Sequence, residues 1–344
     1  MSNINKILLK ALFKHWNHYP SVLPYNLNWM IKLRKEEKEF LSLNPIVFYD
    51  IGARGSAPEE LIPFYSNLEY YAFDADVVEC NRLNTLPNSY SKFTALPYFV
   101  GGNIKREVFN LYRERSHSSV FKPGTRYKEL FSGDGFAVDK EVKIESITMD
   151  EIYAKEASDL PDFIKLDTQG SELEILQASK SVLQAACLIE VEVEFLEVYD
   201  GQPLFHDVAK FMNDNGFELL CLSRAIGQRS QIFNGPSRGQ VIFGDTLFGR
   251  REDFMQDIEI SRMIKYVLLL INYGCIDFAY HLIKLFPNIK VELPSIGRYF
   301  KKNNHGSFIK RMLISQFDKL LMMMLHFRKY NQLEIDSDRS WPFR

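Results

Sequence analysis

The sequence predicts an α/β protein built on a doubly wound, mostly parallel sheet, with helical extensions at both ends of the chain. Two observations support this prediction. Between residues 45 and 249, short β-branched and aromatic runs alternate with helix-forming segments, the pattern of a parallel sheet with helices on both faces. Several runs end in acidic residues, and sheets of this kind bind ligands beyond the carboxyl ends of their strands. We therefore expect the functional site at that edge.

The expected strands follow one another along the chain. They cover residues 45–52, 68–76, 91–102, 142–147, 161–167, 186–195, 216–224 and 237–245. The segment after the fourth strand begins a helix, with Thr148 or Asp150 as its cap. Another helix, over residues 203–216, precedes the last two strands, which form a closing pair.

The two ends of the chain differ from the middle and set the domain boundaries. Residues 1–44 place apolar side chains at helical spacing opposite lysines, which indicates a helix packed on the next domain; a basic amphipathic helix on a membrane is the alternative. Residues 45–249 form the α/β domain. Residues 250–344 contain long helical runs and more Lys and Arg than Asp and Glu. We expect both ends to pack on the domain, to form a homo-oligomer, or to dock peripherally on a membrane-bound assembly line.

Composition argues against several classes of protein. The chain has 344 residues, 46% of them hydrophobic, which is enough for a sizeable core. Its formal net charge of −2 creates no field that attracts nucleic acid. Four widely spaced cysteines without a C-x-x-C pair indicate core thiols in a reducing compartment. We find neither a signal-peptide pattern nor an apolar run near the roughly 20 residues of a membrane span, and expect a cytoplasmic protein.

The first strand runs into a glycine turn, "FYDIGARGS". Gly52 and Gly55 lack a Cβ, so a ligand can approach the backbone there, and we expect the turn to open a helix whose amides face that ligand. The dinucleotide fingerprint G-x-G-x-x-G is absent, which argues against a nicotinamide enzyme. About twenty residues later, Asp74 ends the second strand, where a carboxylate can accept both hydroxyls of a ribose. An ordinary helix cap is the alternative for this aspartate.

Acidic residues also gather at two central strands. Asp167 ends one of them, beside the switch in strand order that a doubly wound sheet requires. The next strand, "LIEVEVEF", puts Glu190, Glu192 and Glu194 on one face by its alternation. Burying all three without partners would be costly, so we expect part of this strand to leave the sheet and face a cleft. Asp167 and Glu192 would then act as general bases, hold a divalent cation, or pair structurally with Lys or Arg.

These segments together resemble the FkbM-type family of S-adenosylmethionine-dependent methyltransferases over about residues 45–245. The resemblance rests on "YDIGARGS", "YAFDAD", "HSSVF", "ITMDEI", "DFIKLDTQGSELEIL" and "EVEFLEVYDGQPLF", in this order. It implies a Rossmann-like class I methyltransferase fold with S-adenosylmethionine as cofactor. It further implies that Asp50, Gly52 and Ala53 line the methionine end, that Asp74 binds the ribose, that "ALPYF" from Ala95 lies near the adenine, and that Asp167 faces the methyl group.

The sequence departs from the common family pattern at two points. Gly55 follows Gly52 by three residues, where many members have a longer spacing, and "DTQG" replaces Asp-Val-Glu-Gly, which removes a negative charge near Asp167 and weakens a metal site. The family resembles enzymes that O-methylate sugar and polyketide hydroxyls. Asp167 and Glu192 are therefore the first candidates for the base that such a transfer requires.

Further residues belong to the same hypothesis. His117 is the second candidate base, and its neighbour Ser118 a candidate cofactor contact, while Tyr199 is a candidate sugar-stacking ring. We expect a sugar hydroxyl in a glycan or polysaccharide precursor as acceptor, and no nucleic acid; a divalent cation stays open. The alternatives are a non-catalytic binding module on a methyltransferase fold and a nicotinamide-dependent oxidoreductase. Retention of Asp50, Gly52, Asp74 and Asp167 argues against the binding module.

Overall fold

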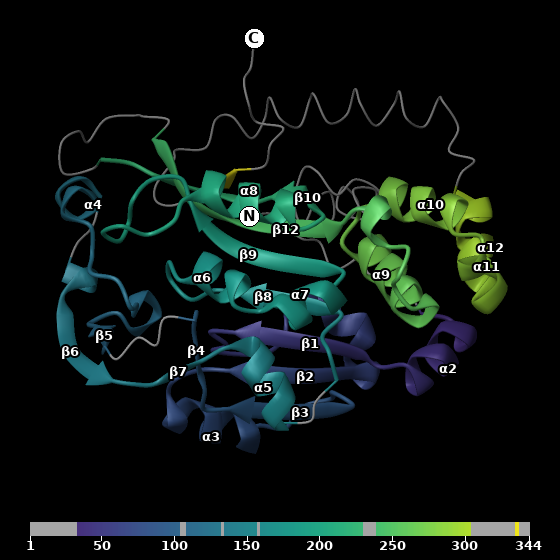
Figure 1. The fold of residues 1–344 in the computed structure, drawn as a ribbon, viewed down its shortest axis with the longest axis horizontal. Helices are drawn as coiled ribbons and strands as arrows, with labels where there is room; N and C mark the ends of the chain where they lie inside the picture. The colour runs from purple at the N-terminus through teal and green to yellow at the C-terminus, as the bar shows by residue number, and fades with distance from the viewer. Residues whose placement is uncertain are drawn as a thin grey trace, which may run out of the picture.

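The computed structural model describes residues 33–103, 108–131, 134–156, 159–229, 239–303 and 334–336 (Figure 1). Most of the expected N-terminal helix and the last long helical run of the chain lie outside these residues. The expectations of membrane docking and self-association through the ends therefore stay predictions. Of residues 1–44, the described part contains α2 (Lys35–Leu43).

A nine-stranded sheet forms the centre of the described structure, in the order β13-β11-β12-β9-β8-β1-β2-β3, with β10 also paired to β12. Its parallel part consists of β1 (Ile46–Ile51), β2 (Leu68–Phe73), β3 (Lys92–Leu96), β8 (Phe163–Leu166) and β9 (Leu188–Glu194). Its antiparallel part consists of β10 (Phe217–Leu222), β11 (Arg224–Gly227), β12 (Gln240–Arg250) and β13 (Glu334–Asp336). The sheet is mostly parallel, as predicted.

The sheet is wound in two directions from β1. The chain first runs outward through β2 and β3, then returns to place β8 on the other side of β1. The carboxyl ends of β1 and β8 therefore meet at the switch point, where open α/β sheets bind ligands. Asp50 and Asp167 lie at these two ends, which confirms the predicted position of Asp167 beside the switch.

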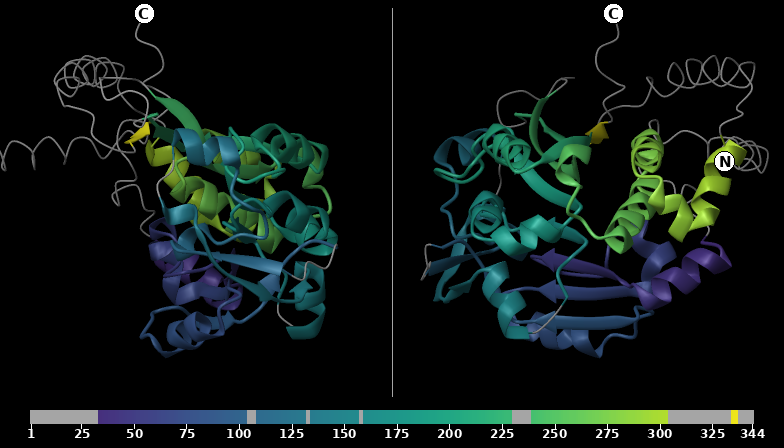
Figure 2. Two further views of the ribbon diagram at one scale, coloured as in Figure 1. Left: turned by 90° about the vertical axis from the view of Figure 1, so that its left-hand side faces the viewer. Right: turned by 45° about the vertical axis from the view of Figure 1, so that its right-hand side comes forward.

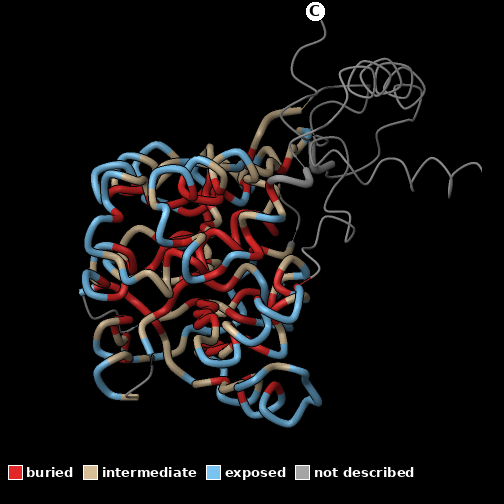
Figure 3. The backbone as a smooth tube through the Cα atoms, turned by 90° about the vertical axis from the view of Figure 1, so that its right-hand side faces the viewer, coloured by how far each residue is buried: buried red, intermediate tan, exposed pale blue. Residues whose placement is uncertain are grey.

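Both faces of the sheet are covered, because alternate residues of each strand enter different cores. One core contains Val47, Tyr49 and Ile51 and is closed by α5 (Met149–Glu156), α6 (Glu172–Gln177), α7 (Lys180–Ala185) and α8 (Phe205–Asp214). The other contains Ile46 and Phe48 and is closed by α2, η2 (Glu59–Asn67), α3 (Val77–Thr85), α9 (Ile260–Asn272), α10 (Ile276–Leu285), α11 (Asn288–Glu292) and α12 (Pro294–Asn303). Figure 3 shows the buried residues running through the centre of the molecule.

The C-terminal extension shares its core with the α/β domain. Figures 1 and 2 show α9 to α12 gathered beside α2 at one side of the sheet. Asp162, 1% exposed, accepts hydrogen bonds from Lys265 Nζ at 2.7 Å, Arg262 Nη1 at 2.9 Å and the Val47 amide at 2.9 Å. These contacts tie α9 to the start of β1. The boundary expected at residue 249 lies at the end of β12, just before η5 (Glu252–Phe254), and residues on both sides of it share one hydrophobic core.

A small lobe that the strand pattern did not predict covers the carboxyl edge of the sheet. It holds the antiparallel pair β5 (Val108–Tyr112) and β6 (Val138–Lys143), with η3 (Arg115–His117), α4 (Thr125–Leu130) and η4 (Asp134–Phe136). Beside it, β4 (Phe99–Val100) pairs with β7 (Ser146–Ile147) in parallel, so the expected strand over 91–102 is divided between two sheets. A third hydrophobic cluster, which includes Tyr112, Phe136 and Tyr199, joins the lobe to the domain.

Three local expectations were wrong. The turn after β1 opens no helix: the chain continues to the 3-10 helix η2, which starts after Pro58 and contains Pro63, two residues that disfavour a regular α-helix here. The strand β9 does not leave the sheet, because it pairs with β12 as far as Glu194. Cys221 is exposed rather than a core residue, since β10 lies on the surface there.

The cap alternatives before α5 are resolved by hydrogen bonds. Thr148 and Glu151 form a capping box: the Glu151 amide donates to Thr148 Oγ1 at 3.1 Å, and the Thr148 amide donates to Glu151 Oε2 at 2.8 Å. Asp150 instead accepts from the amides of Ser181 and Val182, at 2.9 and 3.0 Å, in the first turn of α7.

None of the helices in the described part of the chain has the length and apolar character needed to cross a membrane.

Candidate active site

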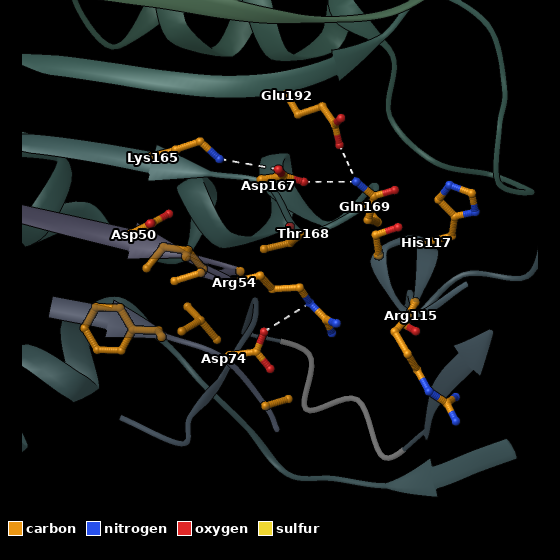
Figure 4. A pocket seen from close by; sticks show the side chains of 18 of the residues that line it. Asp50, Arg54, Asp74, Arg115, His117, Lys165, Asp167, Thr168, Gln169 and Glu192 are labelled. Atoms are coloured by element: carbon orange, nitrogen blue, oxygen red, sulfur yellow. Dashed lines mark hydrogen bonds and ion pairs between the residues drawn. The ribbon is translucent and has the colours of Figure 1, made fainter. Parts of the chain in front are cut away.

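A cavity of about 650 Å³ opens between the carboxyl ends of β1, β2, β8 and β9 and the small lobe (Figure 4). Its lining contains many charged and aromatic side chains. The carboxylates are Asp50, Asp74, Asp167, Glu190, Glu192 and Glu194, and the bases are Arg54, Arg115, His117 and Lys165. The phenyl and phenol rings are Phe73, Tyr98, Phe99, Phe109, Tyr127, Phe136 and Phe243. Most of the predicted site residues are therefore brought to one cavity.

The glycine turn after β1 closes on the protein itself. Gly52 has φ 87°, and a Cβ there would lie 2.0 Å from the carbonyl oxygen of Asp167, so only glycine allows the ends of β1 and β8 to approach this closely. The amides of Gly52 and Ala53 both donate to the Phe73 carbonyl, at 2.9 and 3.0 Å. Space for a ligand lies instead at Gly55, where a Cβ would meet no described atom within 4 Å.

Asp50 presents an unsatisfied oxygen. Its Oδ2 accepts from the Tyr70 hydroxyl at 2.7 Å, while Oδ1 is buried and has no hydrogen-bond partner among the described residues. Burial raises the pKa of Asp50, and the nearby Lys165 ammonium opposes that rise. A buried carboxylate oxygen without a donor is a suitable partner for a cationic or N–H group of a ligand.

The two aspartates of "FDAD" have separate roles. Asp76 caps α3, because its Oδ1 accepts from the amides of Val78 and Glu79 at 2.9 and 3.3 Å. Asp74, 8% exposed, faces the cavity and lies 3.5 Å from Arg54 Nε through Oδ2. Burial raises the pKa of Asp74, whereas its bond from the Asp76 amide and the charge of Arg54 lower it. The helix-cap alternative thus applies to Asp76.

Asp167 and Glu192 are joined by one side chain. Gln169 Nε2 donates to Asp167 Oδ1 at 3.0 Å and to Glu192 Oε2 at 2.5 Å, as Figure 4 shows. The other oxygen of Asp167 lies 3.4 Å from Lys165 Nζ. The two predicted carboxylates are therefore neighbours at one rim, as expected, with an amide between them.

Burial raises the pKa values of the three glutamates of β9. Burial together with the charge of Asp167 places the pKa of Glu192 well above its ordinary value, and burial together with Glu172 does the same for Glu194. Burial raises the pKa of Glu190 to about 8, although Lys165 opposes the rise. These carboxyls line the cavity, and Glu190 lies in register with Lys165 of β8 and Asp50 of β1 across the sheet.

The turn after β8 is held by Glu172. Its buried carboxylate accepts from the Thr168 amide at 2.6 Å, the Thr168 hydroxyl at 2.9 Å and the Gly170 amide at 2.9 Å. Within this turn Gln169 has φ 59° and Gly170 has φ 107°. The sequence "DTQGSE" thus folds back on its own glutamate, which fixes Gln169 beside Asp167.

Comparison with known proteins identifies the domain. Residues 63–219 match the family model described as the methyltransferase FkbM domain. The chain contains an FkbM methyltransferase domain. Strand β1 and the turn after it precede the matched range. Because β1 pairs with β2 and β8, which lie inside that range, β1 belongs to the same sheet as the matched residues. A methyltransferase domain of this family implies S-adenosylmethionine as the methyl donor. The cavity offers such a cofactor the buried, unpartnered Oδ1 of Asp50 and the carboxylate of Asp74.

Two solved methyltransferases resemble this chain at low identity. Precorrin-6y C5,15-methyltransferase from Geobacter metallireducens is 14% identical, with 68% of this chain and 100% of that chain covered and a TM-score of 0.31. Magnesium protoporphyrin IX methyltransferase from Synechocystis, solved with bound S-adenosylmethionine, is 11% identical, with 69% and 90% covered and a TM-score of 0.29. Their similarity is too low to bear on the substrate of this FkbM domain. No curated protein sequence matches the chain.

His117 and Ser118 come from the small lobe of the FkbM domain and line the cavity. The His117 ring stacks on Phe136 with centroids 4.3 Å apart, and burial lowers the pKa of His117. Ser118 Oγ accepts from the Tyr112 amide at 3.2 Å. Tyr199 does not stack on a ligand: its ring is 0% exposed, and its hydroxyl lies 2.8 Å from the His117 carbonyl and 2.9 Å from Gln169 Oε1.

Some functional residues were missed by sequence reasoning. Ala95, predicted to lie near the adenine, is buried in β3 and does not line the cavity. In the segment "ALPYF" the cavity is lined by Tyr98 and Phe99. Lys165 had a signal, a lysine inside the apolar run "FIKL", whereas Arg54 and Arg115 had none. Among the described residues no group of His, Cys, Asp and Glu side chains is arranged to hold a metal ion.

Proposed function

We propose that this protein is an S-adenosylmethionine-dependent O-methyltransferase whose acceptor is a sugar hydroxyl in a glycan or polysaccharide precursor. The observation that carries the proposal is the pair Asp167 and Glu192, joined by Gln169 at the switch point of an FkbM domain. The same cavity contains Asp50 and Asp74, so a cofactor site and a pair of proton acceptors adjoin one another.

Two carboxylates are suited to hold the cofactor. The unsatisfied Oδ1 of Asp50 would accept from the amino group, and Asp74 would accept from the ribose hydroxyls once Arg54 moves aside. When bound, S-adenosylmethionine supplies an electrophilic methyl group. The residues of the chain then have to orient the acceptor oxygen and take its proton.

Asp167 and Glu192 divide these two tasks. Asp167 is fixed by Lys165 and Gln169, which suits a side chain that orients the acceptor hydroxyl. Glu192 has a pKa raised by burial and by Asp167, and a carboxylate of raised pKa is the stronger proton acceptor once ionised. His117, whose pKa burial lowers, faces the cavity from the opposite wall as the second candidate base.

The side chains that line the cavity are suited to a neutral, ring-shaped acceptor. The rings of the lobe, Phe109, Tyr127 and Phe136, offer apolar faces, while the carboxylates offer hydrogen-bond acceptors for hydroxyl groups. Acidic side chains outnumber basic ones in the lining, which disfavours a polyanion such as nucleic acid.

The test is a calorimetric titration with S-adenosylhomocysteine, with NADH as the parallel control. We expect saturable binding of S-adenosylhomocysteine alone. Transfer to sugar acceptors should then fall in Asp167→Asn and Glu192→Gln while S-adenosylhomocysteine binding is retained. Binding without turnover on any acceptor would favour a non-catalytic binding module, and binding of NADH alone would contradict the proposal.

A further inference from the structure

Gln169 connects more of the site than any other side chain of its turn. Its Nε2 bonds to Asp167 and Glu192, its Oε1 lies 2.9 Å from the Tyr199 hydroxyl, and its carbonyl oxygen accepts from Ser119 Oγ at 2.6 Å. These partners come from the end of β8, from β9, from the segment between β9 and α8 that contains Tyr199, and from the loop that carries His117. Gln169 therefore links the carboxylates to the opposite wall of the cavity.

The backbone of Gln169 is in an unfavourable conformation. Its φ of 59° lies in the left-handed region, the only such non-glycine residue in the described part of the chain. A conformation of this kind persists where surrounding contacts determine it, and such residues concentrate at functional sites. Here the conformation points the side-chain amide between two carboxylates (Figure 4).

Two carboxylates this close together repel each other unless a positive or N–H-donating group lies between them. A bound cation is one solution, and the amide of Gln169 is another, because it has two N–H groups and no charge. Lys165 is the second partner of Asp167, since its ammonium group forms an ion pair with Oδ2, the oxygen that Gln169 does not contact. Neither carboxylate then needs a metal ion to remain in place.

We propose that Gln169 is a positioning residue whose amide holds Asp167 and Glu192 together at a point where a divalent cation could otherwise bridge them. The proposal rests on the proposed function, since the pair it positions is the pair assigned to the acceptor. It gives the "DTQG" turn a role that the sequence alone did not suggest. The charged groups that face Glu192 are Asp167, Glu194, Glu172 and Asp245, and all are acidic.

The test is Gln169→Glu, which replaces the bridging amide with a third carboxylate. Thermal unfolding is measured in EDTA and in Mn²⁺, a cation that prefers oxygen ligands. We expect Mn²⁺ to raise the unfolding temperature of this variant by about 2–4 °C or more and to leave the wild type unchanged. Gln177→Glu, at an exposed position of α6, introduces the same charge and should not respond. An equal response of the wild type, or none in a folded Gln169→Glu, would overturn the proposal.

A second variant keeps the test decisive if Gln169→Glu does not fold. Gln169→Met removes the N–H donors with little change in size, so the carboxylates should take up protons more readily. A carboxyl whose pKa rises in the folded state loses its stabilising contribution as pH increases through that pKa. The unfolding temperature of Gln169→Met should therefore fall more steeply with pH than that of the wild type. A parallel curve would indicate lost packing only and overturn the proposal. S-adenosylhomocysteine binding, measured separately, tests the proposed function.

Discussion

The two aspartates of "FDAD" allow the cofactor site to be tested against a control two residues away. Asp74 is 8% exposed and lies in the cavity lining, where it would accept charge-assisted hydrogen bonds from the ribose. Each such bond contributes about 1.5–3 kcal/mol. Asp74→Ala should therefore raise the Kd of S-adenosylhomocysteine on the order of 10- to 150-fold. Asp74→Asn, which keeps the shape but lowers the charge, should have a smaller effect.

Asp76→Ala provides the matched control. It removes the side chain that caps α3 through the Val78 and Glu79 amides, and loss of such a cap costs about 1 kcal/mol of protein stability. The free energy of unfolding should fall by that amount while S-adenosylhomocysteine binding is unchanged.

The assay is calorimetric titration of each variant, with urea unfolding in parallel. Arg54 is released from its ion pair in Asp74→Ala, but its partly exposed side chain can turn to solvent, so we expect no large change in folding stability from this pair. The reasoning is refuted if Asp74→Ala binds as tightly as the wild type, or if both alanine variants lose affinity equally.

Two further predictions concern pH and oxidation. Burial raises the pKa of Glu190 to about 8 from 4.5, so the stabilising contribution of this side chain is full below pH 4.5 and is lost as the pH rises through 8. In urea unfolding at a series of pH values, Glu190→Gln should therefore lose less stability over this range than the wild type. Superimposable profiles would contradict this prediction. Cys221 Sγ and Cys275 Sγ lie 3.8 Å apart. Peroxide should therefore oxidise the two thiols to a disulfide, itself being reduced to water, and the new bond would join β10 to the start of α10. Thiol titration should show two thiols lost in the wild type and none in a Cys221→Ser, Cys275→Ser double variant; an unchanged wild-type count would exclude the link.

Several parts of the fold were predictable because their signals are local. Apolar runs that end in Asp50, Asp74 and Asp167 gave the parallel strands, and the order of the sheet placed their ends together as expected. The small lobe was not predicted, since β6 is largely exposed and polar, and β5 buries the polar Asn110, so neither strand shows a clear apolar alternation. Its contribution to the cavity depends on contacts between segments distant in sequence, such as Tyr199 with His117.

The sequence by itself determined the α/β class, the carboxylates at the edge of the sheet and the resemblance to the FkbM family, because strand patterning and short motifs depend on neighbouring residues. Only the tertiary structure decided which carboxylates meet. It separated the cap Asp76 from the cavity residue Asp74, buried the ring of Tyr199, and inserted Gln169 between Asp167 and Glu192. The physical reason is that hydrogen bonds and burial at this site join β8, β9 and the lobe, segments that are adjacent only in the folded chain.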